Sequence, residues 1–219
     1  APVEVPAPRP EAPAPAALDD DEDVAPEAAA PEAAPEPRAE TRRPWGALAL
    51  AAEVSVGTSG LPRAGGGFGG GLDFARRRWR VGVHGAYWLP RRHELASLGQ
   101  PGASVLLSLG TIRARGCGVP GGARVEVPMC LALELGGMRG VGSGLPINGA
   151  FTGLWSAVVA SPGLLVRLST RVALSLRADA ALAITRPTFT VAPLGAVYQA
   201  PRASLALALG LELRLGPSR

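Results

Sequence analysis

The chain has 219 residues, of which 47% are hydrophobic but only 5% are aromatic and 18% are charged. All 22 basic residues are arginine. Without a lysine amine, the chain can supply neither a Schiff base nor the lysine of a Walker-type phosphate loop. No run of 18 or more apolar residues occurs in the sequence, so we expect neither a transmembrane helix nor a signal peptide.

The first part of the chain differs in composition from the rest. Residues 1–44 hold 11 of the 22 prolines and none of the 29 glycines, and they are almost wholly Ala, Pro and Glu. Such a segment cannot bury enough apolar surface to offset the entropy of ordering, so we expect a disordered tail with polyproline character. A solvated linker and a tether that carries a docking motif both remain open interpretations of this tail.

The charges divide at the same place. Residues 1–44 carry 11 acidic residues against 4 Arg, whereas residues 45–219 carry 18 Arg against 7 acidic residues. The formal net charge of +4 therefore averages an acidic tail and a basic second segment.

The second segment alternates between large apolar residues and small or polar ones. In Ala203–Leu215, every second residue from Leu205 onward is leucine. Successive side chains of a strand point to opposite faces, so this pattern predicts a strand with one wholly apolar face. Similar patterns of varying regularity bring the number of predicted strands to eight, the others being Trp45–Gly57, Phe68–Phe74, Trp79–Leu89, Ala103–Ile112, Met129–Leu135, Leu154–Leu168 and Val172–Ile184.

Short and long connections alternate between these strands. Arg76–Arg78 and Ser169–Arg171 are tight turns. The long connections are Gly57–Gly67, Pro90–Gly102, Gly136–Ala150 and Thr185–Arg202, and Arg113–Pro128 is a long connection on the side of the short turns. Outer-membrane barrels have this arrangement, with short periplasmic turns and longer extracellular loops.

A soluble β-sandwich or a lipocalin-like barrel would also have alternating strands. Three features favour a barrel in lipid: the second face is mainly Ala, Gly and Ser rather than polar, the strands are about 10 residues long, and the aromatics lie at strand ends. The expected aromatic girdles comprise Trp45, Phe74 and Trp79 near the short turns and Phe68, Tyr87, Trp88 and Phe151 near the long loops.

We therefore predict an all-β fold, an eight-stranded antiparallel up-and-down transmembrane β-barrel that follows the disordered tail. Its Leu and Val side chains face lipid, and Gly and Ala fill a narrow interior without a conventional core.

Residues 45–216 resemble the small outer-membrane barrels of the OmpA/OmpX type. The last strand, Gly210–Leu215, is similar to the C-terminal signal of that superfamily, a glycine followed by alternating hydrophobic residues. It departs from that signal because Leu215 stands where a terminal aromatic is usual, and Gly216–Arg219 follow it. The resemblance implies insertion by the barrel-insertion machinery into a bacterial outer membrane, and it carries no catalytic residues.

The strand alternation places eight charged residues and one histidine on the inner face. They are Glu53, Asp73, Arg80, His84, Glu134, Arg177, Asp179, Glu212 and Arg214. In a barrel this narrow, we expect the charges to pair into a plug rather than to line an open pore, because unpaired buried charges are costly. His84 is interpreted as a satisfied interior histidine; a lipid-modifying hydrolase would need a serine partner that the spacing does not supply.

Cys117 and Cys130 are the two cysteines of the chain. An oxidising periplasm favours a disulfide between them, which would close the long connection on the short-turn side and stabilise the protein by about 3 kcal/mol. Two buried free thiols are the alternative. A metal site is disfavoured because no histidine lies nearby, so we expect neither a metal nor a cofactor.

Several arginines lie at the predicted strand ends, namely Arg76, Arg77, Arg78, Arg91, Arg92, Arg171 and Arg202. Guanidinium groups bind phosphate in bidentate fashion, so we expect these rims to contact outer-membrane lipids, including lipopolysaccharide. No nucleic-acid-binding motif accompanies them.

The expected role is that of a monomeric, non-enzymatic protein that presents its long loops outside and its tail in the periplasm. A barrel that passes or binds small solutes or lipophilic ligands is the first alternative, and a lipid-modifying hydrolase is the second.

Overall fold

The structure of the chain is a computed structural model, which describes residues 46–76, 78–96, 99–122, 124–144, 149–192 and 194–215. The expected tail 1–44 lies outside the described residues, as do the expected girdle residue Trp45 and the expected rim residue Arg77. Within the described ranges, no helix is long and apolar enough to cross a membrane.

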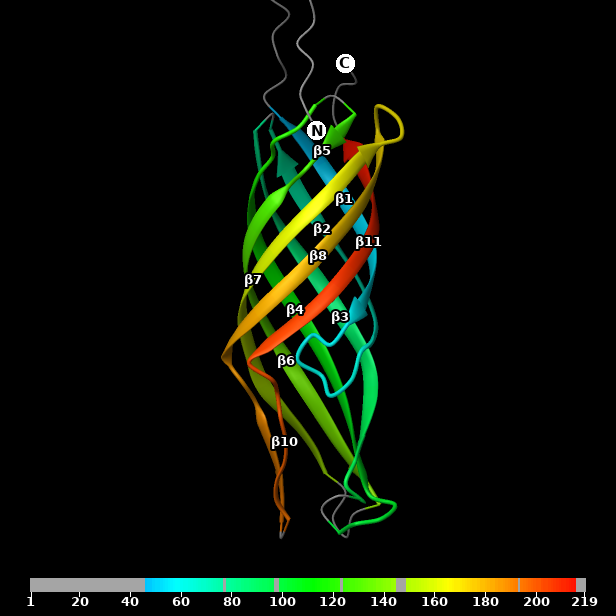
Figure 1. Cartoon of the computed structure of the whole chain (residues 1–219), viewed down its shortest axis with the longest axis vertical. Coiled ribbons are helices and arrows are strands. Elements are labelled where there is room, and N and C mark those ends of the chain that lie inside the picture. Colours follow the sequence, from blue (N-terminus) through cyan, green and yellow to red (C-terminus); the bar gives the residue numbers. More distant parts are fainter. Residues whose placement is uncertain are drawn as a thin grey trace, which may run out of the picture. The chain divides into compact units, whose positions relative to one another are not determined.

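Eight long strands form one closed antiparallel barrel (Figure 1). Neighbours in the chain pair with one another, and the pairing of β11 with β1 closes the sheet. The strands are β1 (Ala47–Gly57), β2 (Gly65–Ala75), β3 (Trp79–Glu94), β4 (Ser104–Gly118), β6 (Met129–Ser143), β7 (Ala150–Arg167), β8 (Val172–Thr185) and β11 (Ala203–Leu215). The predicted fold class, an eight-stranded antiparallel up-and-down barrel, is confirmed.

Three short strands lie outside this ring. β5 (Val125–Glu126) pairs with β7 in the connection between β4 and β6. β9 (Thr188–Val191) and β10 (Gly195–Gln199) form a separate hairpin between β8 and β11. Figure 1 shows that this hairpin extends from the end of the barrel opposite to the one where β1 begins and β11 ends. We call the end where β1 begins and β11 ends the short-turn end, and the end that carries the hairpin the long-loop end.

The alternation of residue types sorts the side chains into an outer wall and an interior, as β11 shows. Leu205 is 69% exposed, whereas its neighbour Ser204 is 6% exposed and Glu212 is 3% exposed. Large apolar side chains on all eight long strands are exposed in the same way. The barrel therefore has an apolar outer surface, as the alternation predicts.

Several strands are longer than predicted, which corrects the expected loops Pro90–Gly102 and Gly136–Ala150. β3 continues past Pro90 to Glu94 because a bulge between Trp88 and Arg91 absorbs the proline. β6 continues to Ser143, so only residues 144–149 connect it to β7. The predicted loop 185–202 contains the β9–β10 hairpin.

β4 also ends later than predicted, at Gly118 instead of Ile112, which corrects the expected connection Arg113–Pro128. Its outward positions beyond Ile112 are Ala114, Gly116 and Gly118, and none of these is a large apolar residue. A search for alternating large apolar residues therefore misses the last part of this strand, although the backbone pairing continues through Cys117 and Cys130.

The expectation of an interior without a conventional core is wrong. A cluster of buried apolar side chains fills the barrel toward the long-loop end, and its members on the long strands include Trp88, Leu107, Leu109, Met138 and Trp155. Leu61 and Leu95 from the connections, with Phe189 and Val197 from the hairpin, belong to the same cluster. This apolar layer closes the interior at the long-loop end.

The aromatic girdles need one correction. Phe74 and Trp79 are exposed with ring centroids 5.7 Å apart, and Phe68 and Tyr87 form a second exposed pair at 5.7 Å. Trp88 is not a girdle residue, because it points inward and is 3% exposed. The strand parity of Trp88 already places it on the inner face, opposite to Tyr87.

Candidate functional site

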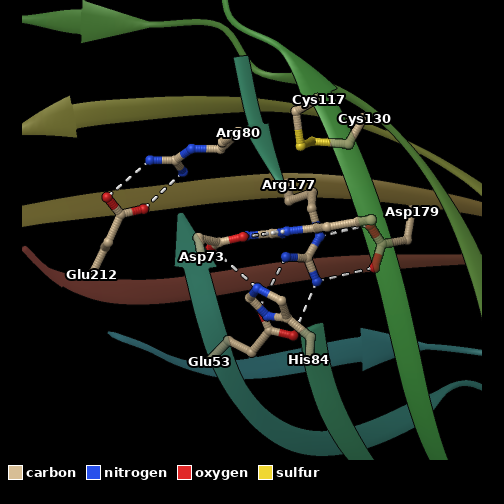
Figure 2. Close-up of a disulfide and its surroundings, with 10 residues drawn as sticks. Glu53, Asp73, Arg80, His84, Cys117, Cys130, Arg177, Asp179 and Glu212 are labelled. Carbon is tan, nitrogen blue, oxygen red and sulfur yellow. Dashed lines mark hydrogen bonds and ion pairs between the residues drawn. A yellow bond between two sulfur atoms is a disulfide. The ribbon is translucent and has the colours of Figure 1, made fainter. Parts of the chain in front are cut away.

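The remaining interior, toward the short-turn end, is filled by charged side chains. We call this set the ionic layer; it consists of Glu53, Asp73, Arg80, His84, Arg113, Arg115, Glu134, Arg177, Asp179, Glu212 and Arg214. Figure 2 shows several of these side chains pointing toward one another from different strands. The structure thus brings together all nine interior residues that the strand alternation indicates, and adds Arg113 and Arg115.

Arg80 and Glu212 form a bidentate pair near the short-turn end. The Arg80 Nη1 and Nη2 atoms donate to the two carboxylate oxygens of Glu212 at 2.8 and 3.0 Å, and both side chains are 3% exposed. Arg214 donates a further hydrogen bond from Nε to Glu212 at 3.0 Å. A buried carboxylate with two guanidinium partners stays ionised without leaving an unpaired charge.

A second group connects four strands through Asp179. Arg177 donates to Asp179 at 2.7 Å from Nε and to Glu53 at 2.9 and 3.0 Å from its terminal nitrogens. Arg113 donates to the other oxygen of Asp179 at 2.7 Å and to Glu134 at 2.6 Å. These charge-assisted bonds tie β1, β4, β6 and β8 together across the barrel interior.

His84 belongs to a third group around Asp73. His84 Nε2 lies 3.1 Å from Asp73 Oδ2, and Arg115 donates to the same carboxylate at 2.6 and 3.1 Å. The neighbouring strand positions are glycine here: a Cβ on Gly71 would come within 2.5 Å of the His84 ring, and one on Gly82 within 2.0 Å of Asp73. The glycines of β2 and β3 therefore make the room in which this group packs.

The charges of the ionic layer balance. Five carboxylates, from Glu53, Asp73, Glu134, Asp179 and Glu212, face five guanidinium groups, from Arg80, Arg113, Arg115, Arg177 and Arg214. The inner-face pattern of the sequence indicates an acidic excess because Arg113 and Arg115 lie in the part of β4 that was expected to be a loop. The signal that could have found them is their spacing: Arg113, Arg115 and Cys117 continue the parity of Thr111.

Trp155 joins the apolar layer to the ionic layer. Its indole Nε1 donates to Glu134 Oε1 at 2.9 Å, and the ring is 1% exposed within the apolar layer. Because this carboxylate also accepts from Arg113, Glu134 connects the ionic layer to the apolar layer. Sequence reasoning did not assign a role to Trp155.

A small ionic cluster lies at the short-turn end. Glu126 of β5 accepts from Arg214 at 3.0 Å and also pairs with Arg167. Burial alone would raise the pKa of Glu126, but Arg214 and Arg167 lower it, and the net pKa lies below the usual value. Sequence reasoning did not single out Glu126 or Arg167, because the short strand β5 has no alternation of its own.

The predicted disulfide is confirmed. Cys117 of β4 and Cys130 of β6 are bonded to each other directly across the two strands, with their Cα atoms 4.0 Å apart and both side chains 6% exposed (Figure 2). The bond closes the connection that contains β5, on the side of the ionic layer.

Tyr198 anchors the hairpin over the long-loop end. Its hydroxyl donates to the carbonyl of Gly60 at 2.6 Å, and its ring lies 5.4 Å from that of His93. Burial raises the pKa of Tyr198 to about 12, although Arg91 opposes that shift. The contact holds the hairpin against the connection between β1 and β2.

The expected rim arginines occupy different environments. Arg76, Arg78, Arg92, Arg171 and Arg202 lie at the two ends of the barrel, and none of them is buried. Arg91 is not a rim residue: it is 9% exposed, lies 5.6 Å from the Trp88 ring and donates to the backbone carbonyls of Thr58 and Arg63. The bulge in β3 turns Arg91 inward and leaves Arg92 outside.

No group of acidic, histidine and cysteine side chains in the described ranges could hold a metal ion. His84 has Asp73 as its hydrogen-bond partner, and its Nδ1 is buried without one. The salt bridges of the ionic layer neutralise buried charge and cross-link strands.

Comparison with known proteins identifies the architecture. No protein-family model and no curated protein matches the chain. Among solved structures, a major outer membrane protein from Thermus thermophilus is 14% identical, with a TM-score of 0.51 over 77% of this chain and 99% of that chain. The chain has the fold of a small outer-membrane β-barrel.

Two further barrels are similar at lower scores. The N-terminal barrel domain of Pseudomonas aeruginosa OprF is 10% identical, with a TM-score of 0.49 over 78% of this chain and 99% of that chain. Neisserial surface protein A is 12% identical, with a TM-score of 0.48 over 78% of this chain and 97% of that chain. At such low identities, the similarity extends to the barrel fold and not to a biological role.

Proposed function

We propose that the chain is an integral outer-membrane protein whose barrel is a closed, non-enzymatic anchor. The observation that carries this proposal is the combination of an exposed apolar wall with a filled, charge-neutral interior. In water, a wall of exposed leucines on every side would drive aggregation, whereas in a bilayer the same wall is the surface that lipid requires.

The two ends of the barrel suggest its orientation. Outer-membrane barrels place short turns in the periplasm and longer connections outside. The tight turn between β7 and β8, with the beginning of β1, would then face the periplasm, and the tail 1–44 would be available there. The β9–β10 hairpin and the connections around it would face the exterior and offer a surface to partners.

The filled interior supports an anchoring role over a passage role. The ionic layer occupies the barrel toward the short-turn end, and the apolar layer with Trp88 and Trp155 occupies it toward the long-loop end. A solute would have to break paired buried charges and displace packed side chains to cross.

Membrane fractionation and conductance test this proposal together. Expressed in a Gram-negative host with a secretion signal, the protein should sediment with the outer membrane and resist extraction by alkaline carbonate. Reconstituted in planar bilayers, it should show no steady single-channel conductance. A protein found in the soluble fraction would refute the membrane assignment, and a conductance that changes with Arg177→Ala would refute the closed interior.

A further inference from the structure

A shallow groove lies on the outer wall of the barrel across β2, β3, β4 and β6. It has a volume of about 630 Å³, and Phe68, Tyr87, Ile112 and Leu135 border it. Its floor includes Gly85 and Gly110, which occupy outward positions of β3 and β4. Because these large side chains stand around a floor that contains glycine, the groove is a local depression in a surface that lipid would contact.

The two outward glycines are not required by packing within the barrel. A Cβ on Gly85 would have its nearest neighbour at 3.8 Å, and one on Gly110 at 3.9 Å, which are ordinary contact distances. This differs from Gly71 and Gly82, where a Cβ would collide with His84 and Asp73. A Cβ would therefore fit at both positions, and yet both are glycine, which leaves the groove open.

Two arginines lie on the same wall, toward the long-loop end from the groove. Arg139 follows Gly137, the partner of Gly110 in the register, by two residues, which is about 7 Å along the strand. Arg92 pairs with Leu106 on the other side of β4. Both side chains are exposed, and within the described part of the chain neither forms a salt bridge.

An apolar groove next to two exposed guanidinium groups, which form no salt bridge with the described residues, matches an amphiphile that carries both a hydrocarbon chain and a phosphate. We propose that the groove binds an acyl chain of lipid A, the phosphorylated anchor of lipopolysaccharide, with a phosphate between Arg92 and Arg139. The choice of lipid A rests on the proposed function, since it requires the long-loop end to face the leaflet that contains lipopolysaccharide. The site would fix one lipid on the β2–β6 side of the barrel.

Native mass spectrometry of the full chain in a non-ionic detergent, titrated with purified lipid A, tests the site. Gly110→Leu fills the groove, and Gly116→Leu is the matched control, since it adds the same side chain to the same face of β4 at a glycine with open space around it. We expect Gly110→Leu to weaken lipid A binding about tenfold, the loss expected when about two methylene groups leave the groove. Gly116→Leu should bind like the wild type.

The double variant Arg92→Ala/Arg139→Ala tests the phosphate contact, with Arg171→Ala at the opposite rim as its control. The double variant should also bind about tenfold more weakly, and phosphatidylglycerol should compete poorly with lipid A for the wild type. Equal binding by Gly110→Leu and Gly116→Leu would overturn the proposal, as would equal competition by phosphatidylglycerol. A wild-type dimer that Gly110→Leu dissociates would also overturn it, because the groove would then belong to a second copy of the chain.

The same samples distinguish a failure of the proposed lipid A site from a failure of the proposed function. Each variant is also inserted into lipid vesicles, and the inserted fraction is measured by resistance to carbonate. If the variants insert but filling the groove by Gly110→Leu does not weaken lipid A binding, the proposed site is wrong and the membrane assignment stands. If the wild type does not insert, the proposed function itself fails.

Discussion

Replacing Glu212 tests most sharply whether ion pairs hold the barrel interior together. Glu212→Leu removes the carboxylate that accepts two hydrogen bonds from Arg80, at 2.8 and 3.0 Å, where both side chains are 3% exposed. In the described residues, Arg80 has no other salt bridge. The variant therefore leaves a buried, unpaired guanidinium group, and the free energy of unfolding should fall by about 3–5 kcal/mol.

Replacing Arg80, alone and together with Glu212, completes a double-mutant cycle. Arg80→Met should cost less, about 1–3 kcal/mol, because Glu212 keeps the hydrogen bond from Arg214 at 3.0 Å. The double variant Arg80→Met/Glu212→Leu removes both charges and fills the space with apolar groups. It should lie within about 1 kcal/mol of the wild type, since replacing a whole buried pair by apolar residues is often neutral or stabilising.

Urea unfolding of the protein in lipid vesicles, followed by tryptophan fluorescence, gives the four free energies by linear extrapolation. Gel mobility of the same samples confirms that each variant starts from the folded barrel. The reasoning would be refuted if Glu212→Leu lowered the free energy of unfolding by less than about 1 kcal/mol. It would also be refuted if the double variant lowered that free energy by the sum of the two single losses.

Three further predictions concern other parts of the barrel. In a Tyr87→Phe background, which leaves Tyr198 as the one tyrosine, absorbance at alkaline pH should show Tyr198 losing its proton near its raised pKa of about 12 rather than 10.0. The contribution of Tyr198 to the free energy of unfolding is then complete below pH 10 and is lost as the pH rises toward 12. Titration of Tyr198 near pH 10 would contradict this. Iodoacetamide should label no thiol before reduction, and Cys117→Ser/Cys130→Ser should cost about 3 kcal/mol; full labelling without reductant would contradict the disulfide. Trp155→Ala should cost about 3–5 kcal/mol because it opens a cavity and removes the donor to Glu134, whereas exposed Phe151→Ala should cost less; equal losses would contradict an interior role for Trp155.

The outer wall of the barrel could be predicted from the sequence wherever leucine marks the lipid-facing positions. In β11, six alternating leucines define both the strand and its outer face, and the predicted bounds Ala203–Leu215 agree with the structure. The C-terminal part of β4 was missed because Ala and Gly occupy its outward positions, although lipid-facing positions in a barrel need not all be large.

The interior was harder to predict because it depends on register. Strand parity alone identifies Glu134 and Asp179 as inward residues, but their common partner Arg113 comes from a strand that extends beyond its last large apolar residue. The apolar layer was missed for two reasons. Trp88 was assigned to the aromatic girdle although its strand parity points it inward, and Phe189 comes from a hairpin inside a connection that was expected to be a loop. Contacts between distant strands follow from pairing that composition and periodicity do not specify.

Heat-modifiable gel mobility in lipid vesicles tests most directly the claim that this chain is a transmembrane barrel. Protein inserted into vesicles and loaded without boiling should migrate faster than the same sample after boiling, because the closed hydrogen-bonded barrel stays compact in detergent until it is heated. An unboiled sample that leaves the vesicles on washing and migrates identically to the boiled one would contradict the account.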